Sequence, residues 1–262
     1  MRFSILTLFP DLFRGPLEVS ILQRARQRGL LEVVTRDIRA HAPGRHRQVD
    51  DAPFGGGPGM VLRTDVLDQA LAAVLAEAPG HVVLLSPQGS PFRQADAWRL
   101  AVLPHVVLIC GHYEGIDERF VATRVDEELS LGDFVLTGGE IPALAVIDAV
   151  TRLLPGVLGD AMSAQAESFQ GGVLDHPHYT RPAEWAGIPV PPVLRSGDHG
   201  AVADWRRRQA LLRTLIRRPD LLNGARWNKH EQRLLAALTR DLDAMAAEDP
   251  GRHDRTSGAW PE

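Results

Sequence analysis

Three short apolar runs constrain the fold more than any other feature of this chain. Residues 3–9, 81–85 and 105–110 are rich in valine, isoleucine and leucine, and each leads into a turn that contains proline or glycine. Such continuous runs are typical of buried strands. Between the first two runs, apolar residues recur at helical spacing from Thr64, the expected N-cap, until Pro79 and Gly80 end the pattern. Alternating strands and helices predict an α/β fold with a mostly parallel sheet.

The loops that follow the predicted strands are the first place to expect a site, because ligands of such sheets bind at the carboxyl ends of strands. The loops after Leu85, Cys110 and Leu131 each contain glycines and polar residues. Each is weak evidence alone, but together they offer backbone donors, apolar walls and carboxylates to a small ligand with an adenine-like face and a polar tail. The glycine-rich segment 50–60 lacks the Lys-Ser/Thr ending of a phosphate loop, so a plain turn stays an alternative there.

The sequence changes character near residue 157. Residues 160–200 are rich in glycine, proline, aspartate, histidine and serine, and helical patterns follow, with Trp205, Leu212 and Ile216 on one side of the first. We therefore expect two domains, an α/β domain at residues 1–160 and a small helical domain at residues 176–246. A flexible linker at residues 161–175 would join them, and a disordered tail at residues 247–262 would follow.

The charge distribution favours a polyanion on one face of the helical domain. The whole chain has a net charge of −4, but residues 195–226 contain eight arginines against three aspartates. Arg206, Arg213 and Arg217 fall on a single stripe of the predicted helix. A nucleic acid would suit such a stripe, and a solvated arginine-rich helix is the alternative.

Several classes of protein are disfavoured. Cys110 is the single cysteine, so no intramolecular disulfide can form, and its apolar neighbours indicate a buried, reduced thiol. No signal peptide pattern begins the chain and no apolar run reaches the roughly 18 residues of a membrane span, so we expect a cytoplasmic protein. No hydrolase elbow is present. His176 and His178 have no further histidine or cysteine at ligand spacing, so we predict no metal site.

The longer motifs, taken in order, resemble the tRNA (guanine-N1)-methyltransferase family of the knotted SPOUT methyltransferases. The resemblance runs from the first apolar run to Pro219, over more than four fifths of the chain. The strings that carry it are Asp51–Met60, Gly111–Arg119, Gly132–Glu140, Pro155–Gly159, Pro177–Pro182 and Pro191–Leu194.

The resemblance implies a trefoil knot, a homodimer, S-adenosylmethionine as methyl donor and tRNA as substrate, with no membrane or DNA partner. The methylated atom would be N1 of the guanine at tRNA nucleotide 37, and a Mg²⁺ requirement is a family expectation without a legible site here. By motif match, the donor pocket would be lined by Leu84, Leu85, Ser86, Pro87, Gln88, Gly111, Tyr113, Glu114, Gly115, Leu131, Gly132, Asp133, Phe134, Val135, Leu136, Gly138, Gly139 and Pro142.

The resemblance also implies catalytic roles. Guanine N1 must lose a proton to become a good nucleophile, so a base and a group that stabilises charge on the guanine oxygen are needed. The family places a carboxylate in the linker and an arginine before the Pro-Gly-Val-Leu-Gly string, here Arg152. Where the family has Asp before Ser-Phe, this chain has Glu167, and we favour it as the base, with Asp175 as the alternative. Arg206, Arg213 and Arg217 would bind RNA.

Two other functions stay open at this point. A knotted enzyme could methylate a ribose hydroxyl instead, although the linker carboxylate argues against it. The chain could also be a non-catalytic RNA-binding module with a vestigial donor pocket.

Overall fold

The computed structural model describes residues 1–159, 167–223 and 227–248 of the 262-residue chain. The chain divides into two compact units, Met1–Ala164 and Gln165–Glu262. Residues 161–166 of the predicted linker and 249–262 of the predicted tail lie outside the described residues. The predicted domain limits therefore stay predictions.

The first unit is built around a five-stranded sheet in the order β2-β1-β6-β5-β7, in which all neighbouring strands run parallel. The strands are β1 (Arg2–Thr7), β2 (Glu32–Asp37), β5 (His81–Pro91), β6 (His105–Cys110) and β7 (Glu127–Ser130). The three apolar runs form β1, β6 and the first half of β5, so the prediction of an α/β fold with a mostly parallel sheet is confirmed. The central strand β6 is buried along its whole length.

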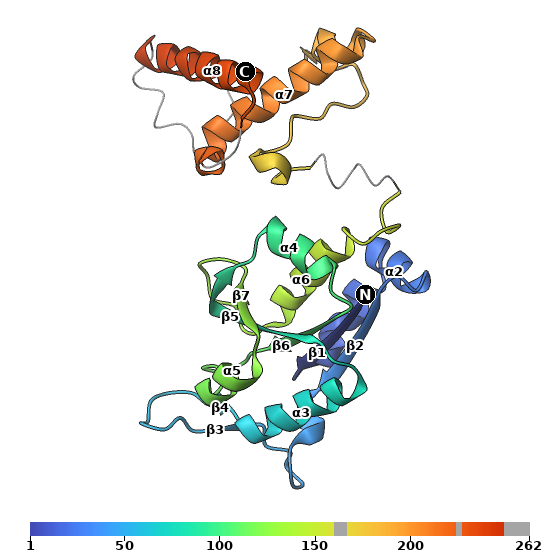
Figure 1. Cartoon of the computed structure of the whole chain (residues 1–262), viewed down its shortest axis with the longest axis vertical. Coiled ribbons are helices and arrows are strands. Elements are labelled where there is room, and N and C mark those ends of the chain that lie inside the picture. Colours follow the sequence, from blue (N-terminus) through green and yellow to red (C-terminus); the bar gives the residue numbers. More distant parts are fainter. Residues whose placement is uncertain (160–166, 224–226, 249–262) are drawn as a thin grey trace. The chain divides into compact units, whose positions relative to one another are not determined.

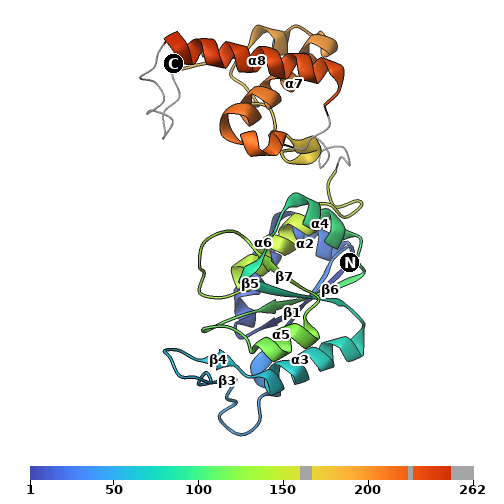
Figure 2. The ribbon, with the colours of Figure 1, turned by 60° about the vertical axis from the view of Figure 1, so that its left-hand side comes forward.

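Helices cover both faces of this sheet (Figures 1 and 2). One face carries α1 (Arg14–Leu17), α2 (Ser20–Gln27), α4 (Gln94–Ala101) and α6 (Glu140–Thr151), and the other carries α3 (Thr64–Glu77) and α5 (Glu118–Arg124). Side chains of β1 alternate between the two cores: Phe3 and Ile5 pack with the first group, and Leu6 packs with the second. The 3₁₀ segments η1 (Pro10–Phe13) and η2 (Ile38–His41) follow β1 and β2.

The start of α3 differs by one residue from the prediction. Thr64 is already helical, and Arg63 holds the N-cap position without a side-chain capping bond. The Arg63 guanidinium instead pairs with Asp65 in the first turn, at 2.6 Å. Just before this helix, β3 (Asp50–Asp51) and β4 (Val61–Leu62) form a small antiparallel pair that closes the glycine-rich segment.

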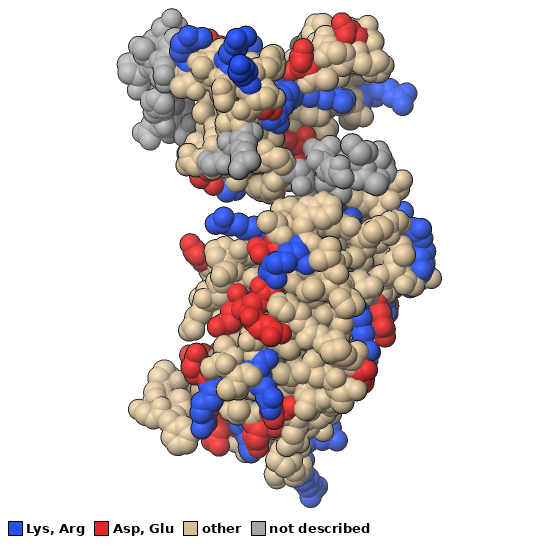
Figure 3. Space-filling model, in the orientation of Figure 1, with Lys and Arg blue, Asp and Glu red and all other residues tan. Residues whose placement is uncertain are grey.

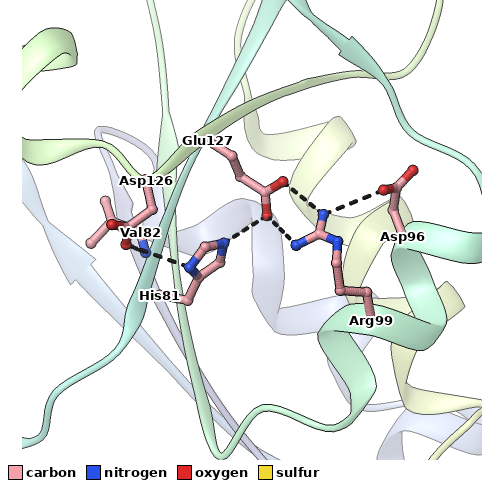
Figure 4. Close-up of polar contacts among 6 residues, drawn as sticks. All are labelled: His81, Val82, Asp96, Arg99, Asp126 and Glu127. Carbon is pink, nitrogen blue, oxygen red and sulfur yellow. Dashed lines mark hydrogen bonds and ion pairs between the residues drawn. The ribbon is translucent and has the colours of Figure 1, made fainter.

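A polar network ties the amino ends of β5 and β7 to α4 (Figure 4). His81 Nε2 lies 2.8 Å from Glu127 Oε1, and Arg99 Nη2 donates to the other Glu127 oxygen at 2.7 Å. The Asp126 carboxylate accepts from the Val82 N–H at 2.8 Å. These contacts fix the amino ends of the strands, opposite the edge at which a ligand is expected.

The second unit is mainly α7 (His199–Arg217) and α8 (Lys229–Glu248). Short elements precede or join them: η4 (Gln170–Gly172), β8 (Glu184–Trp185), β9 (Ile188–Pro189), η5 (Pro192–Arg195) and η6 (Pro219–Leu222). Its core contains Val173, Ala210, Leu211 and Leu238. No helix among the described residues has both the length and the apolar character that crossing a membrane requires.

The residues that α7 buries fully are Ala210, Leu211 and Thr214. Of the apolar residues noted on one side of the predicted helix, Leu212 packs against the core of the second unit, whereas Ile216 is 53% exposed.

Candidate active site

A cavity of about 340 Å³ opens at the carboxyl ends of β5, β6 and β7. All the residues predicted for the donor pocket line it except Asp133. Eight further residues line it that were not among those predicted for the pocket: His112, Ile116, Glu118, Val121, Glu128, Leu129, Ser130 and Thr137. The parallel sheet thus brings together loops that are separated by up to about 50 residues along the chain.

A bulge in β5 forms one wall of the cavity. The strand pairs with β7 up to Leu85, leaves the register, and pairs again from Ser90. The intervening residues 86–88 curve around the cavity, and the Gln88 N–H donates to Ser86 Oγ at 3.1 Å. A bulge of this kind turns backbone groups that would otherwise pair within the sheet toward a ligand.

The opposite wall depends on close backbone contact at Gly139. Its N–H donates to the Gly111 carbonyl at 3.0 Å, which joins the loop after β6 to the start of α6. A Cβ at this position would lie 2.6 Å from Cys110 Cα, so only glycine fits. Cys110 is fully buried, as predicted, and burial together with the nearby Glu140 raises the pKa of its thiol well above the ordinary value.

Glu140 and His112 form a buried polar contact behind this wall. Glu140 is the first residue of α6 and is 2% exposed. Its Oε1 accepts from Thr7 Oγ1 at 2.6 Å, and its Oε2 lies 2.7 Å from His112 Nε2. Both residues occur in the motif strings, yet their sequence positions do not indicate that they meet. The pair links β1, the loop after β6 and α6.

Loop 111–116 is also fixed by the glycine-rich segment. The Glu114 N–H donates to the Met60 carbonyl at 2.9 Å, and the Leu62 N–H donates to the Gly115 carbonyl at 3.0 Å. The next helix, α5, is capped by Asp117, which accepts from the Arg119 N–H and guanidinium. These bonds hold the pKa of the Asp117 carboxyl far below its usual range. Asp117 therefore keeps its charge and its cap at any physiological pH.

The two predicted bases lie close together in the chain of the second unit, and Arg152 lies in the first, where it ends α6. Glu167 is half-buried, and the neighbouring Ser168 Oγ accepts from the Asp175 N–H at 2.9 Å. Burial alone would raise the pKa of Asp175, but hydrogen bonds from His178 and from the His176 N–H outweigh it and lower the pKa. Asp175 is thus a firmly ionised carboxylate.

Three of the arginines on and beside α7 are held in ion pairs within the second unit. Arg207 pairs with Glu231, Arg208 with Asp241 at 3.6 Å and Arg218 with Asp220 at 2.7 Å. Arg206, of the predicted stripe, is exposed. Figure 3 shows Lys and Arg side chains on the visible face of this unit, with fewer acidic ones between them.

A second cavity, of about 310 Å³, lies beside α7. Arg213 and Arg217 line it, together with Pro177, Tyr179, Gln209, Leu212 and Ile216. Two residues of the predicted stripe therefore border an apolar hollow next to an aromatic ring, and Arg206 does not. On this side of α7, Leu212 also packs against the core of the second unit, and Ile216 is 53% exposed.

Known proteins resemble this chain over nearly its whole length. The family model described as tRNA (Guanine-1)-methyltransferase TrmD matches residues 1–224. A tRNA (guanine-N(1)-)-methyltransferase of Magnetococcus marinus is 62% identical over 94% of this chain and 98% of its own length. Proteins with the same name from Desulforudis audaxviator and Chloroflexus aurantiacus are 55% and 51% identical, covering 94% and 99% of this chain and 99% and 100% of their own.

The chain belongs to the tRNA (guanine-1)-methyltransferase family. The resemblance carried by its motifs is confirmed, and the chain is an enzyme of the methyltransferase class. The matched region includes both the cavity at the sheet edge and α7 of the second unit.

Gly139→Ala tests whether this methyltransferase binds its donor in the cavity at the sheet edge. The new Cβ would press on the backbone of Cys110 and push the start of α6 away from Gly111. We expect affinity for S-adenosylmethionine, measured by calorimetry, to fall by about tenfold or more, which corresponds to about 1.4 kcal/mol. Gly15→Ala is the matched control, because its Cβ would meet no heavy atom within 4 Å. Unchanged affinity in a folded Gly139→Ala protein would place donor binding elsewhere.

Proposed function

We propose that this chain transfers a methyl group from S-adenosylmethionine to N1 of the guanine at tRNA nucleotide 37. The observation that carries the proposal is that the family's motif residues surround one cavity at the carboxyl edge of the sheet. The relatives with 51–62% identity are named for the same reaction on tRNA guanine N1. Methylation at nucleotide 37 and the use of S-adenosylmethionine as donor are inferred from the family resemblance.

The cavity fits the donor in size and in charge. Its volume of about 340 Å³ lies within the usual range for small-molecule sites. Apolar side chains such as Leu84 and Leu136 would hold the adenine. Glu114, Glu118 and Glu128 are acidic lining residues that would balance the positive charges of an ammonium and a sulfonium. The sulfonium supplies a methyl group that is already activated for transfer, so the protein must supply alignment and proton removal.

Glu167 is proposed as the general base that takes the proton from guanine N1. Its rival, Asp175, has a lowered pKa, because His178 and the backbone of His176 stabilise its ionised form. A carboxylate that is stabilised in this way is a weaker proton acceptor, which favours Glu167. Arg152 is proposed to stabilise the negative charge that grows on the guanine oxygen, since a guanidinium keeps its charge and presents several donors.

The proposed assembly is a homodimer with a trefoil-knotted first domain, acting on tRNA in the cytoplasm. Apolar side chains support a second copy as partner: Val135 is 85% exposed at the cavity, and Ile141 in the first turn of α6 is 57% exposed. Exposed apolar side chains of this kind, beside a ligand site, often mark subunit contacts. The arginines of α7 are proposed to contact the tRNA backbone.

Mg²⁺, which the resemblance leads one to expect, does not fit the metal-ligand group that the structure offers. Mg²⁺ prefers octahedral oxygen ligands and retained water. Among the described residues, one cluster of three metal-ligating side chains occurs, and it combines Asp175 with two imidazoles. No step of the proposed mechanism is assigned to Mg²⁺.

The first experiment identifies the product. Unmodified tRNA with guanine at nucleotides 36 and 37 is incubated with the protein and S-adenosylmethionine, digested to nucleosides and analysed by mass spectrometry. We expect 1-methylguanosine, formed at nucleotide 37. The control substrate is the same tRNA with adenosine in place of guanosine at position 37. Ribose-methylated nucleosides would assign a different reaction, and binding of donor and tRNA without any product would indicate an RNA-binding module.

The proposed base is tested by Glu167→Gln with Asp175→Asn as its counterpart. Loss of the Glu167 carboxylate should reduce single-turnover methyl transfer by about 10²–10⁴-fold, the range for a positioned proton acceptor. Donor and tRNA affinity should stay unchanged, since neither the cavity nor α7 contains Glu167. Glu167→Asp restores the family residue and should retain substantial activity.

The reverse result would move the assignment. If Asp175→Asn abolishes transfer with both substrates bound while Glu167→Gln proceeds at nearly the original rate, Asp175 is the base. If both variants transfer normally, no linker carboxylate acts as the base and the proposed proton removal is wrong.

The tRNA contact is tested by replacing Arg206, Arg213 and Arg217 with alanine together. Each lost phosphate contact should lower the slope of log affinity against log salt by about 1. A control variant replaces Arg14, Arg24 and Arg45, which are exposed on the first unit, and changes the net charge equally. Donor affinity should survive in both variants. Equal tRNA affinity of the two triple variants, measured by filter binding at several salt concentrations, would contradict the assigned role.

A further inference from the structure

Three side chains near the start of the second unit converge on one point that the proposed reaction does not use. Asp175, His176 and His178 each offer one ligand atom, and these atoms lie within 4.8 Å of one another. The sequence predicted no metal site at His176 and His178, because only histidine and cysteine ligands were considered there. With Asp175 added to the two histidines, we infer a binding site for a divalent transition-metal cation, with Zn²⁺ as the best-fitting ion. The site goes beyond the proposed methyl transfer and does not depend on it.

The distances between the ligand atoms are close to those around a bound zinc ion. His178 Nε2 lies 2.9 Å from Asp175 Oδ2, and His176 Nε2 lies 3.8 Å from Asp175 Oδ1. Two ligands on a tetrahedral zinc, each at roughly 2.0–2.1 Å, are separated by about 3.4 Å. The two observed distances, which go to different oxygens of the Asp175 carboxylate, lie on either side of this value. One ligand atom from each of the three residues lies within 4.8 Å of the others, so the side chains must draw closer together to bind one ion.

The tautomer of His176 leaves the lone pair on Nε2, the ring nitrogen nearer to the Asp175 carboxylate. His176 Nδ1 lies 3.1 Å from the Pro177 carbonyl oxygen, which can only accept a hydrogen bond. In the neutral ring, Nδ1 therefore carries the proton and Nε2 carries the lone pair. A lone pair and the Asp175 carboxylate then face each other across 3.8 Å, too far for a hydrogen bond. With the ring in this form, a cation between the two groups would bind both of them.

The backbone that carries the ligands is anchored to the core of the second unit. The Leu174 N–H donates to Thr214 Oγ1 at 2.9 Å, and Thr214 is fully buried on α7. On the other side of Asp175, Pro177 restricts the chain between the two histidines. Their rings lie on the same side, with centroids 4.5 Å apart. Such anchoring reduces the conformational entropy that metal binding would cost.

The donor set selects the type of ion. Two imidazole nitrogens and one carboxylate suit zinc and neighbouring transition metals, whereas Mg²⁺ and Ca²⁺ prefer oxygen donors alone. Three protein ligands leave one tetrahedral position for water or another ligand. The side chain of His178 is 70% exposed, so the ion can enter from solvent. The Asp175 carboxylate supplies the oxygen ligand, and its Oδ1 accepts a hydrogen bond from the His176 N–H at 2.7 Å, which orients it.

Calorimetric titration of the full chain with ZnCl₂, after removal of bound metal with a chelator, tests the site directly. We expect one ion bound per chain, and titration with Co²⁺ should give the visible absorption bands of a low-coordinate nitrogen–oxygen site. His176→Ala and His178→Ala should each lower the affinity for Zn²⁺ by about tenfold or more, or about 1.4 kcal/mol. His199→Ala is the matched control, because His199 is an exposed histidine of the same unit outside the cluster.

Two outcomes would overturn the site. Equal Zn²⁺ binding by the original chain and by the double variant His176→Ala/His178→Ala would show that other histidines bind the metal. Displacement of Co²⁺ by an equal concentration of Mg²⁺ would show that the site does not prefer transition-metal ions over Mg²⁺. Neither readout involves methyl transfer, so failure here leaves the proposed reaction untouched, and failure of that reaction leaves this test valid.

Discussion

The buried carboxylate of Glu140 is the contact on which the geometry of the cavity depends. A buried carboxyl group gives up its hydrogen bonds to water, so it is stable only where hydrogen bonds within the protein replace them. Thr7 and His112 supply these bonds, at 2.6 and 2.7 Å, and the position in the first turn of α6 adds the favourable field of a helix amino terminus. One side chain thereby joins β1, the loop after β6 and α6, and holds Gly139 against Gly111.

One end of the sheet stabilises the fold, and the other end forms the cavity. At the amino ends of β5 and β7, the network of His81, Arg99 and Glu127 binds strands and helix together. At the carboxyl ends, the β5 bulge and the loops after β6 and β7 leave their backbone groups around a cavity. Charge is divided in a similar way, with acidic residues at the cavity and arginines on α7. This division reconciles a net charge of −4 with a polyanionic substrate.

The sequence predicted most reliably the features that depend on local pattern. The run 105–110 is apolar at almost every position because β6 is buried on both faces. Strand β2 escaped prediction, since charged residues such as Glu32 and Arg36 interrupt it. The strand-end rule located the cavity, but the pairing of His112 with Glu140 joins residues 28 apart in sequence, and no local pattern records it. The sequence did not indicate which residues of α7 are fully buried, because only the packing of α8 and the segment around Val173 determines this.

The two carboxylates near the start of the second unit show how environment separates groups of the same chemistry. Asp175 accepts hydrogen bonds from His178 and from the His176 N–H, and its lowered pKa means that it holds a proton poorly. A base must hold the proton that it removes, so these contacts reduce the usefulness of Asp175 in that role. A metal ligand must instead stay ionised, and the hydrogen bond from the His176 N–H, which a bound ion would leave in place, favours this state. The hydrogen bond from the Asp175 N–H to Ser168 Oγ keeps the chain next to Glu167 in place beside this cluster. The proposed proton removal by Glu167 and the proposed cation binding by Asp175 are therefore compatible within one segment.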